Sequence, residues 1–313
     1  MPPALDLRPL TPADYDATAV LLHRSLVHWY QTRLGQGARF GDRPEGFRLF
    51  PEVYGALDAG HDVAAFDRAT GALLGVCFVH PRETHVAVGI VATAPESQGR
   101  GVARAMLAPV VAAARARGLP VRLVSSLLNL DSFSLYSRLG FVPHTLYQDL
   151  AIEVPAAGLA HPPPPGTDRV SPVTTVAAAA ELADFEHALQ GIRREQDYTF
   201  FLENRLGDWR VWASRDAAGR LEGFLVASLH PACPMLGPGA AADESVAAAL
   251  AWRALDAFRG RSVVFLVPSS AATLVRQGYA WGAKNVELHA AQAVGPVPPA
   301  RGVAFPTFLP ETG

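Results

Sequence analysis

Two glycines follow a run of small and β-branched residues in the first half of the chain, and their spacing could serve phosphate chemistry. Gly99 and Gly101 stand behind the run 86–94 and in front of a helical pattern that extends to Gly118. A loop between a strand and a helix presents backbone N–H groups at the open start of the helix, where the helix dipole also attracts negative charge. The sequence therefore predicts a site for an anionic cofactor at this loop.

Side chains that can transfer protons stand on both sides of the loop. His80, Glu83 and His85 surround the turn before the run of β-branched residues, and one of them could relay a proton, although solvated turn residues would give the same pattern. His80 and His85 lack close helical spacing and a third partner, so no metal site is expected. Asn129 and Tyr136 follow downstream, where Asn129 could equally cap or turn the chain and Tyr136 could equally pack among apolar neighbours.

The elements that must position these residues alternate between strands and helices. A proline at position 109 inside the helix behind the loop is expected to kink that helix. Asp131 is expected to cap the short helix that carries Tyr136, and Gly140 to end it in a left-handed conformation. The predicted strands are 5–9, 61–67, 72–80, 85–93, 121–126 and 142–154, and the predicted helices are 12–30, 47–57, 101–118 and 131–139.

A proline-rich stretch divides the chain, and the pattern of the first half returns behind it. His161 to Gly166 reads HPPPPG, an extended spacer, so we expect domains at residues 1–160 and 169–313 joined by a linker at 161–168. The hairpin pattern from Ala65 recurs from Trp212, followed by a helix over 243–258, a strand over 262–267 and a short helix that ends at Gly278. The second copy lacks the spacing of the glycine loop and places Leu274 where Tyr136 would fall, which predicts one active site per chain.

The composition favours a protein that works on small molecules. The 313 residues carry 27 basic and 29 acidic side chains, two cysteines and no apolar run of the roughly 18 residues that a membrane helix needs. We therefore expect a cytoplasmic monomer or homodimer with no nucleic-acid or membrane partner and no metal. The last five residues read LPETG, a surface-sorting pattern without its usual flanking segments, and are interpreted as a native tail or an added tag.

The loop and its downstream partners resemble the GCN5-related N-acetyltransferase (GNAT) superfamily. That family places Gln or Arg, two variable residues, Gly, one variable residue, then Gly or Ala in its acetyl-CoA loop. Asn129, Tyr136 and the ending Leu139–Phe141 follow in the family's order. The resemblance covers about residues 3–155 and extends to the second half only through the repeat. It rests at the loop on Gln98, Gly99, Arg100, Gly101, Val102 and Ala103.

This resemblance implies a fold and a set of roles. The implied fold is α/β (α+β), with two GNAT-like domains, each a mixed, mostly antiparallel twisted sheet flanked by helices, the second degenerate. Acetyl-CoA is the implied co-substrate: the loop binds its pyrophosphate, with added charge from Arg100, and Asn129 also lies among the cofactor-binding residues. The implied pairing partners of the pantetheine amides are the backbone groups of Val91, Ala92 and Thr93.

The implied reaction is acetyl transfer to a primary amine, on a small molecule or a peptide, by direct attack. Tyr136 matches the family's general acid, and a phenol with an ordinary pKa near 10 is protonated at neutral pH. Glu83 and His85 are the residues expected to accept the proton of the amine. A module that binds CoA or an acyl-CoA without catalysis, as a sensor or in an assembly, is the alternative.

Overall fold

The computed structural model describes residues 4–311, which form two compact units. Unit 1 takes the chain up to Arg82, then Val86–Val121 and the segment from Leu309, and unit 2 takes most of the remainder. This division does not follow the proline-rich stretch at 161–168, because a strand ahead of that stretch pairs with two strands behind it. The boundary between the sequence domains therefore stays a prediction. Thr312 and Gly313 of the LPETG ending lie outside the described residues.

The sheet of unit 1 consists of four antiparallel strands in sequence order, close to the four strand segments that the sequence predicts. The hairpin turns at Asp67, whose carboxylate accepts hydrogen bonds from the backbone of Ala69 and Thr70. The strands are β1 (Leu5–Arg8), β2 (Val63–Asp67), β3 (Leu73–Pro81) and β4 (Val86–Thr93).

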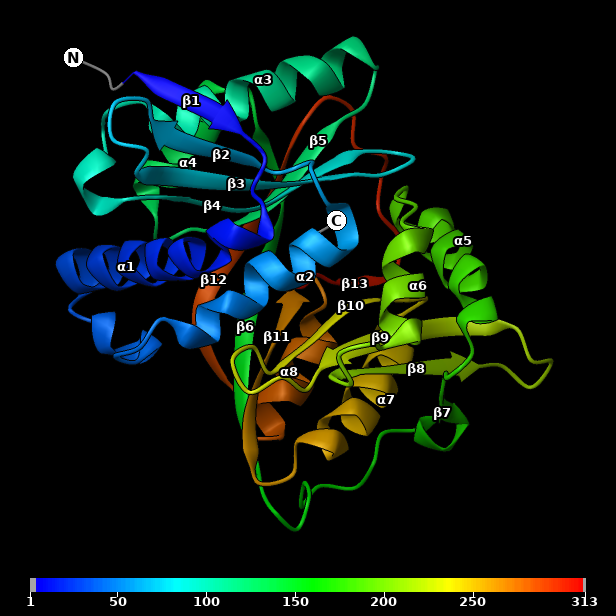
Figure 1. Ribbon diagram of the computed structural model, residues 1–313. Helices are drawn as coiled ribbons and strands as arrows, with labels where there is room; N and C mark the ends of the chain where they lie inside the picture. The colour runs from blue at the N-terminus through cyan, green and yellow to red at the C-terminus, as the bar shows by residue number, and fades with distance from the viewer. Residues whose placement is uncertain (1–3, 312–313) are drawn as a thin grey trace. The chain divides into compact units, whose positions relative to one another are not determined.

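Helices cover both faces of this sheet (Figure 1). On β3, Phe78 stacks on Tyr54 of α2 (Leu49–Asp58) and belongs to a buried cluster with Leu22 of α1 (Tyr15–Leu34). Gly75 of β3 faces the other way, since a Cβ there would lie 2.9 Å from the Met106 side chain of α3 (Val102–Ala116). Side chains alternate across a strand, so the even-numbered residues of β3 face α1 and α2. His80 therefore lies on the α1–α2 face.

Unit 2 contains a mixed sheet in which β6 pairs with two strands that follow much later in the sequence, β11 and β12. Along β12–β6–β11–β10–β9–β8–β7 every pair is antiparallel except β10 and β11, and β13 pairs with β10. β5 (Val121–Ser126), largely in this unit, continues into Leu127, which donates to the Leu288 carbonyl. The other strands are β6 (Val142–Val154), β7 (Val170–Pro172), β8 (Trp209–Arg215), β9 (Leu221–Ser228), β10 (Met235–Ala241), β11 (Arg261–Pro268), β12 (Lys284–Val294) and β13 (Val303–Phe305).

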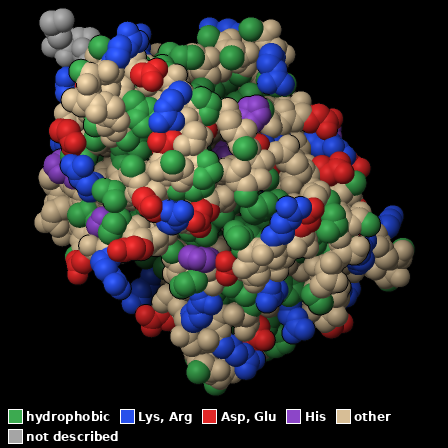
Figure 2. Space-filling view, in the orientation of Figure 1, with side chains coloured by type: hydrophobic (Ala, Val, Ile, Leu, Met, Phe, Trp, Pro, Cys, Tyr) green, Lys and Arg blue, Asp and Glu red, His purple; other side chains and the backbone are tan. Residues whose placement is uncertain are grey.

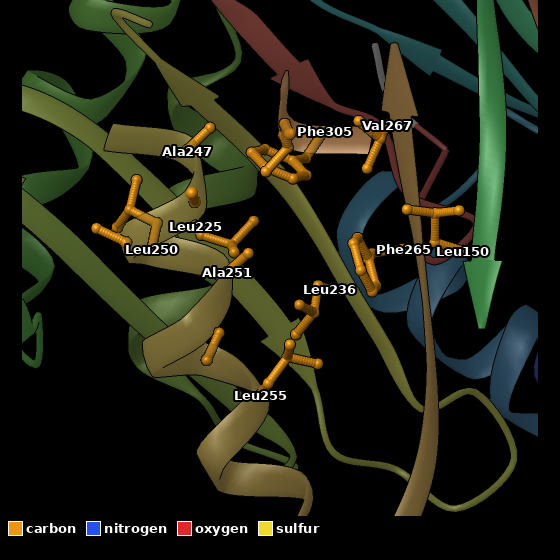
Figure 3. Packing of buried hydrophobic residues seen from close by; sticks show 14 of the residues in the cluster. Leu150, Leu225, Leu236, Ala247, Leu250, Ala251, Leu255, Phe265, Val267 and Phe305 are labelled. Carbon is orange, nitrogen blue, oxygen red and sulfur yellow. The ribbon is translucent and has the colours of Figure 1, made fainter. Parts of the chain in front are cut away.

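The helix α7 of unit 2 buries an alanine- and leucine-rich face against this sheet. Leu250 and Leu255 of α7 point toward Leu225, Leu236 and their neighbours on the strands (Figure 3). The close fit also needs Gly223, where a Cβ would lie 2.9 Å from the Leu250 side chain. The helices are α4 (Leu130–Arg138), α5 (Ala179–Gln190), α6 (Glu195–Glu203), α7 (Glu244–Leu255) and α8 (Ala272–Ala280).

The predicted fold class is confirmed, and three local predictions need correction. Asn129, not Asp131, caps α4, because its Oδ1 accepts from the Ser132 backbone N–H at 3.0 Å. α8 does not end at Gly278 but continues to Ala280, and α1 continues to Leu34. α3 continues across Pro109, and the kink expected there stays a prediction.

The extension of α8 changes how the repeats align. In the first repeat, Phe141 N–H donates to the Tyr136 carbonyl and Gly140 has a φ of 93°. In the second repeat, Ala283 N–H donates to the Gly278 carbonyl and Gly282 has a φ of 100°. Gly278, rather than Leu274, therefore occupies the position that corresponds to Tyr136. The second repeat has no side chain there at all.

No helix within residues 4–311 combines the length and apolarity needed to cross a membrane. On the face shown in Figure 2, basic and acidic side chains are interspersed, in line with 27 basic and 29 acidic residues.

Replacing Leu250 by Ala should lower the free energy of unfolding by about 2–5 kcal/mol, because Leu250 is fully buried and the change leaves a cavity. Urea unfolding followed by tryptophan fluorescence measures it. The matched control is Leu206→Ala at an exposed leucine, where about 0.5 kcal/mol or less is expected. Equal losses in the two variants would contradict this packing.

Candidate active site

The predicted cofactor loop joins β4 to α3 and has the backbone that its glycines require. Gly99 and Gly101 adopt left-handed conformations, with φ of 72° and 84°, which residues with a Cβ rarely adopt. A Cβ on either would meet no atom within 4 Å, so the requirement comes from backbone conformation and not from crowding. Gln98, Gly99, Arg100 and Gly101 are all exposed. The loop therefore presents backbone to solvent at the start of α3.

The helix that follows the glycine loop in the first repeat, α3, and its counterpart in the second repeat, α7, have different residues at the N-cap position. Gly101 occupies the N-cap position of α3, and no side chain caps that helix. Asp243 occupies the N-cap position of α7, and its carboxylate accepts from the backbone N–H groups of Ser245 and Val246, each at 2.9 Å. A carboxylate of the protein thus takes the place that an anion could occupy in the second repeat, whereas the first repeat leaves its helix start open.

β4 contains a bulge just before the residues predicted to pair with pantetheine. Cys77 of β3 lies opposite Val91, but Val79 lies opposite Val88, so Phe78 faces two residues of β4, Gly89 and Ile90. Ile90 packs against the buried cluster on the α1–α2 face, and a Cβ on Gly89 would point to the same face. A bulge leaves one residue outside the regular ladder and redirects the strand. Of the three predicted pairing residues that follow, Val91 and Thr93 are half-buried and Ala92 is buried.

Tyr136 and Asn129 lie on the same short helix, α4. Tyr136 is 7% exposed and packs edge-on against Phe141, with ring centroids 5.7 Å apart. The packing role foreseen for this ring is thus real, and it fixes where the phenol points. Asn129 uses its Oδ1 as the helix cap, so the capping role foreseen for it is confirmed. Its cofactor-binding role, like the proton-donor role of Tyr136, stays a prediction.

The two predicted proton acceptors differ in their surroundings. Glu83 is exposed and pairs with Arg193 at 2.9 Å. His85 is fully buried, with Nδ1 3.0 Å from the Thr84 hydroxyl, and that hydroxyl accepts from the Arg193 backbone N–H. These contacts hold the turn before β4 in place, and both catalytic roles remain predictions.

The structure adds a buried ionic cluster that the sequence did not reveal. His80 Nδ1 lies 2.6 Å from Asp58 Oδ2, and Arg82 donates to both oxygens of the same carboxylate, at 2.8 and 2.9 Å. Burial opposes ionisation of Asp58, but the hydrogen bonds from His80 and Arg82 outweigh it and lower the pKa of Asp58 to about 2. Arg82 is close to His80 in sequence, but Asp58 lies at the end of α2, more than twenty residues earlier. No local sequence pattern indicates that Asp58 pairs with these two residues.

A small cavity of about 10 Å³ adjoins the cluster, room for about one water molecule. Its lining includes Tyr54, Asp58, His80 and Asp62. Burial raises the pKa of Asp62 to about 6, although the Leu10 backbone N–H donates to its carboxylate at 3.2 Å. A second titratable carboxyl group thus lies beside the cluster.

Other features contribute less to a site. The aromatic end of α1 packs internally: Tyr30 contacts Trp29 and Phe40 edge-on, while His28 is exposed. A cavity of about 300 Å³ beside the end of α7 contains none of the predicted site residues. Among residues 4–311, the His, Cys, Asp and Glu side chains form no group of three placed to hold a metal ion.

Comparison with solved structures places this architecture in the class of GNAT folds. A putative acetyltransferase from Pyrococcus horikoshii superposes with a TM-score of 0.72 at 14% identity, covering 98% of this chain and 93% of its own. A GCN5-related N-acetyltransferase from Sphaerobacter thermophilus gives 0.60 at 16% identity, with coverages of 95% and 97%. A tandem GNAT protein from the clavulanic acid biosynthesis pathway gives 0.59 at 18% identity, with coverages of 93% and 99%.

Residues 25–141 match the profile of the Acetyltransferase (GNAT) family. This part of the chain is therefore similar to GNAT acetyltransferases, a family that uses acetyl-CoA as co-substrate, and the whole chain has a GNAT fold. No curated protein sequence is similar enough to match the chain.

The raised pKa of Asp62 predicts a pH-dependent stability. The folded state holds this proton more tightly than the unfolded state, so ionised Asp62 destabilises the fold above the folded pKa of about 6. Asp62→Asn should therefore raise the free energy of unfolding by about 1 kcal/mol at about pH 8, a figure reduced for the partial exposure of the carboxylate, and by nothing below about pH 4. Urea titrations across this pH range measure the difference. The exposed Asp42→Asn is the control, and a gain that does not vary with pH would contradict the assignment.

Proposed function

We propose that this chain transfers the acetyl group of acetyl-CoA to a primary amine, using one site per chain, in the first repeat. The observation that carries the proposal is the uncapped start of α3 at Gly101, directly behind the bulged strand β4. An N-terminal helix end with free backbone donors suits a pyrophosphate. Asp243 argues against a second site, because it supplies its own carboxylate to the start of α7.

The bulge, the predicted pantetheine-pairing residues and the glycine loop follow one another along the chain, and this order sets the orientation of the bound cofactor in the proposal. With the pyrophosphate at Gly99–Gly101, the pantetheine runs back along Val91–Thr93, because it can pair with the backbone of an extended strand. The thioester then reaches the bulge at Gly89 and Ile90. A bulge residue stands outside the strand ladder, so its N–H can donate to the carbonyl oxygen of the acetyl group as negative charge develops there.

The transfer needs three roles beyond binding. The neutral amine attacks the thioester carbonyl, the C–N bond forms and the C–S bond breaks. In this proposal Tyr136 gives its proton to the departing CoA thiolate, as its match to the family pattern implies. Glu83 and His85 remain the residues that the sequence nominates to receive the proton of the amine.

Tyr136→Phe should lower kcat by about 10²–10⁴-fold, the usual contribution of a general acid, while leaving the Kd for acetyl-CoA within about twofold. The ring and its contact with Phe141 survive the change, so the fold should not be affected. Steady-state kinetics with a panel of amines and calorimetry with acetyl-CoA measure the two effects. Unchanged turnover would remove the acid role from Tyr136.

Gly101→Val should weaken acetyl-CoA binding at least about tenfold, because valine disfavours the left-handed backbone that opens α3. Gly219→Val is the matched control: Gly219 has a φ of 82°, close to the 84° of Gly101, and a Cβ on either meets no atom within 4 Å. Gly219 lies in the turn between β8 and β9, so its substitution should carry a similar strain without loss of affinity. Equal affinity in the two variants would contradict the loop assignment.

A CoA-binding module without catalysis is the second candidate, favoured by the degenerate second repeat. Release of free CoA that depends on an added amine supports transfer. Tight binding of acetyl-CoA without any such release supports the module, and the absence of binding contradicts both.

A further inference from the structure

The cluster of Asp58, His80 and Arg82 lies next to the bulge of β4, within unit 1. A Cβ built on Gly89 would lie 3.0 Å from His80 Nε2 and 3.2 Å from the hydroxyl oxygen of Tyr54. The imidazole and the phenol therefore approach the backbone of the bulge closely, and they can do so because position 89 has no side chain. A Cβ at this position would be a tight contact, which the imidazole or the phenol could relieve only by moving a few tenths of an ångström.

The hydrogen bond to Asp58 determines which nitrogen of His80 can accept a proton. Asp58 is held as a carboxylate, with its pKa lowered to about 2, and an ionised carboxylate only accepts hydrogen bonds. Nδ1, 2.6 Å from Asp58 Oδ2, therefore carries the proton of the neutral imidazole. Nε2 is then the basic nitrogen, and it is the one directed toward Gly89.

We propose that His80 is the residue that accepts the proton of the attacking amine, with Asp58 and Arg82 as positioning residues. Asp58 fixes the tautomer and the ring plane, and Arg82 fixes Asp58 through two hydrogen bonds. The inference rests on the proposed acetyl transfer, because that reaction places the thioester at the bulge. The amine nitrogen loses a proton to Nε2, directly or through one water, as its lone pair forms the C–N bond.

The same surroundings provide a route for the proton to leave. His80 is 1% exposed, so its proton cannot pass straight to solvent. The cavity beside it, with room for about one water, is also lined by Asp62, which is only partly buried. Asp62 is the acceptor through which a water in the cavity passes the proton outward. The titratable and charged groups around His80 are Tyr54 and Asp58 from α2, Asp62 behind α2, and Arg82 behind β3.

A buried ionic cluster of this kind is not explained by stability alone. Taking three charged or polar groups out of water is costly, and apolar residues of similar volume often stabilise a fold equally well. The stacked contact of Tyr54 with Phe78 on the same face shows that this part of the sheet accepts apolar packing. A role in proton transfer accounts for both the charged residues and the missing side chain at position 89.

The test is the pH profile of kcat/KM for a panel of small primary amines, with His80→Asn as the principal variant. Asparagine keeps an N–H donor for Asp58 but has no basic nitrogen, so the cluster is preserved and the base is lost. We expect kcat/KM to fall about 10²–10⁴-fold and the acidic limb of the profile to disappear, with the acetyl-CoA Kd within about twofold. Asp58→Asn should reduce kcat/KM less than His80→Asn does, because the base remains, and it should shift the acidic limb of the profile to a different pH.

Three further variants make the result specific. His161→Asn, at an exposed residue of the proline-rich stretch, is the control and should leave the profile unchanged. His85→Asn and Glu83→Gln test the other two proton acceptors nominated by the sequence. Loss of the acidic limb in either of these variants, with the limb intact in His80→Asn, would overturn the assignment.

Two measurements on the wild-type protein keep the test decisive if His80→Asn fails to fold. The titration midpoint of the His80 imidazole, from NMR of histidine-labelled protein, should coincide with the acidic limb, and a mismatch would overturn the inference. If the wild type transfers acetyl groups and His80→Asn is unaffected, the inference alone fails. If the wild type binds acetyl-CoA but transfers to no amine, the proposed function fails and this role of His80 fails with it.

Discussion

One extra residue in β4 is the constraint on which the rest of unit 1 depends. Because Gly89 and Ile90 together oppose Phe78, the side-chain alternation of β4 shifts by one position at the bulge. Above the bulge, Val91–Thr93 lead toward the glycine loop and the start of α3. Below it, Gly89 leaves the space that His80 and Tyr54 approach. In a regular strand without the extra residue, the side chains of β4 beyond this point would face the opposite side of the sheet. The strand would then not bring the residues that lead to the loop and the space at Gly89 into the same proposed site.

The two repeats differ at the helix start where the first repeat is proposed to bind an anion. Both pair a central helix with a sheet, but residues 94–101 separate β4 from α3, whereas only residues 242 and 243 separate β10 from α7. The shorter connection places Asp243 at the helix start, where its carboxylate satisfies two backbone donors. The second repeat has Gly278 where the first has Tyr136, so it also lacks a side chain that could act as the general acid. The second repeat therefore keeps the packing but lacks the residues to which the proposed chemistry is assigned, and its strands complete a sheet with β6.

Local patterns predicted the strands of the first half, both hairpins, the strand near β11 and the loop, because each depends on neighbouring residues; they did not predict β7, β10, β12 or β13. The runs of β-branched residues and the glycines with positive φ are local signals. The correction at α8 arose from a glycine that lies inside the helix, where it leaves room for Leu150 instead of ending the turn. The pairing of β12 with β6 and the contact of Asp58 with His80 join residues far apart in sequence, so no local pattern could predict them. The bulge at Gly89 is likewise set by its pairing with β3.

Hydrogen–deuterium exchange of the full chain with and without acetyl-CoA would locate the cofactor on the backbone and distinguish the two repeats. We expect slower exchange at the amides of Gly99–Ala103 and Val91–Thr93 on saturation, with no change at Ser245–Ala247, where Asp243 already caps the helix start. No protection at Gly99–Ala103, or stronger protection at Ser245–Ala247, would contradict the proposed cofactor site.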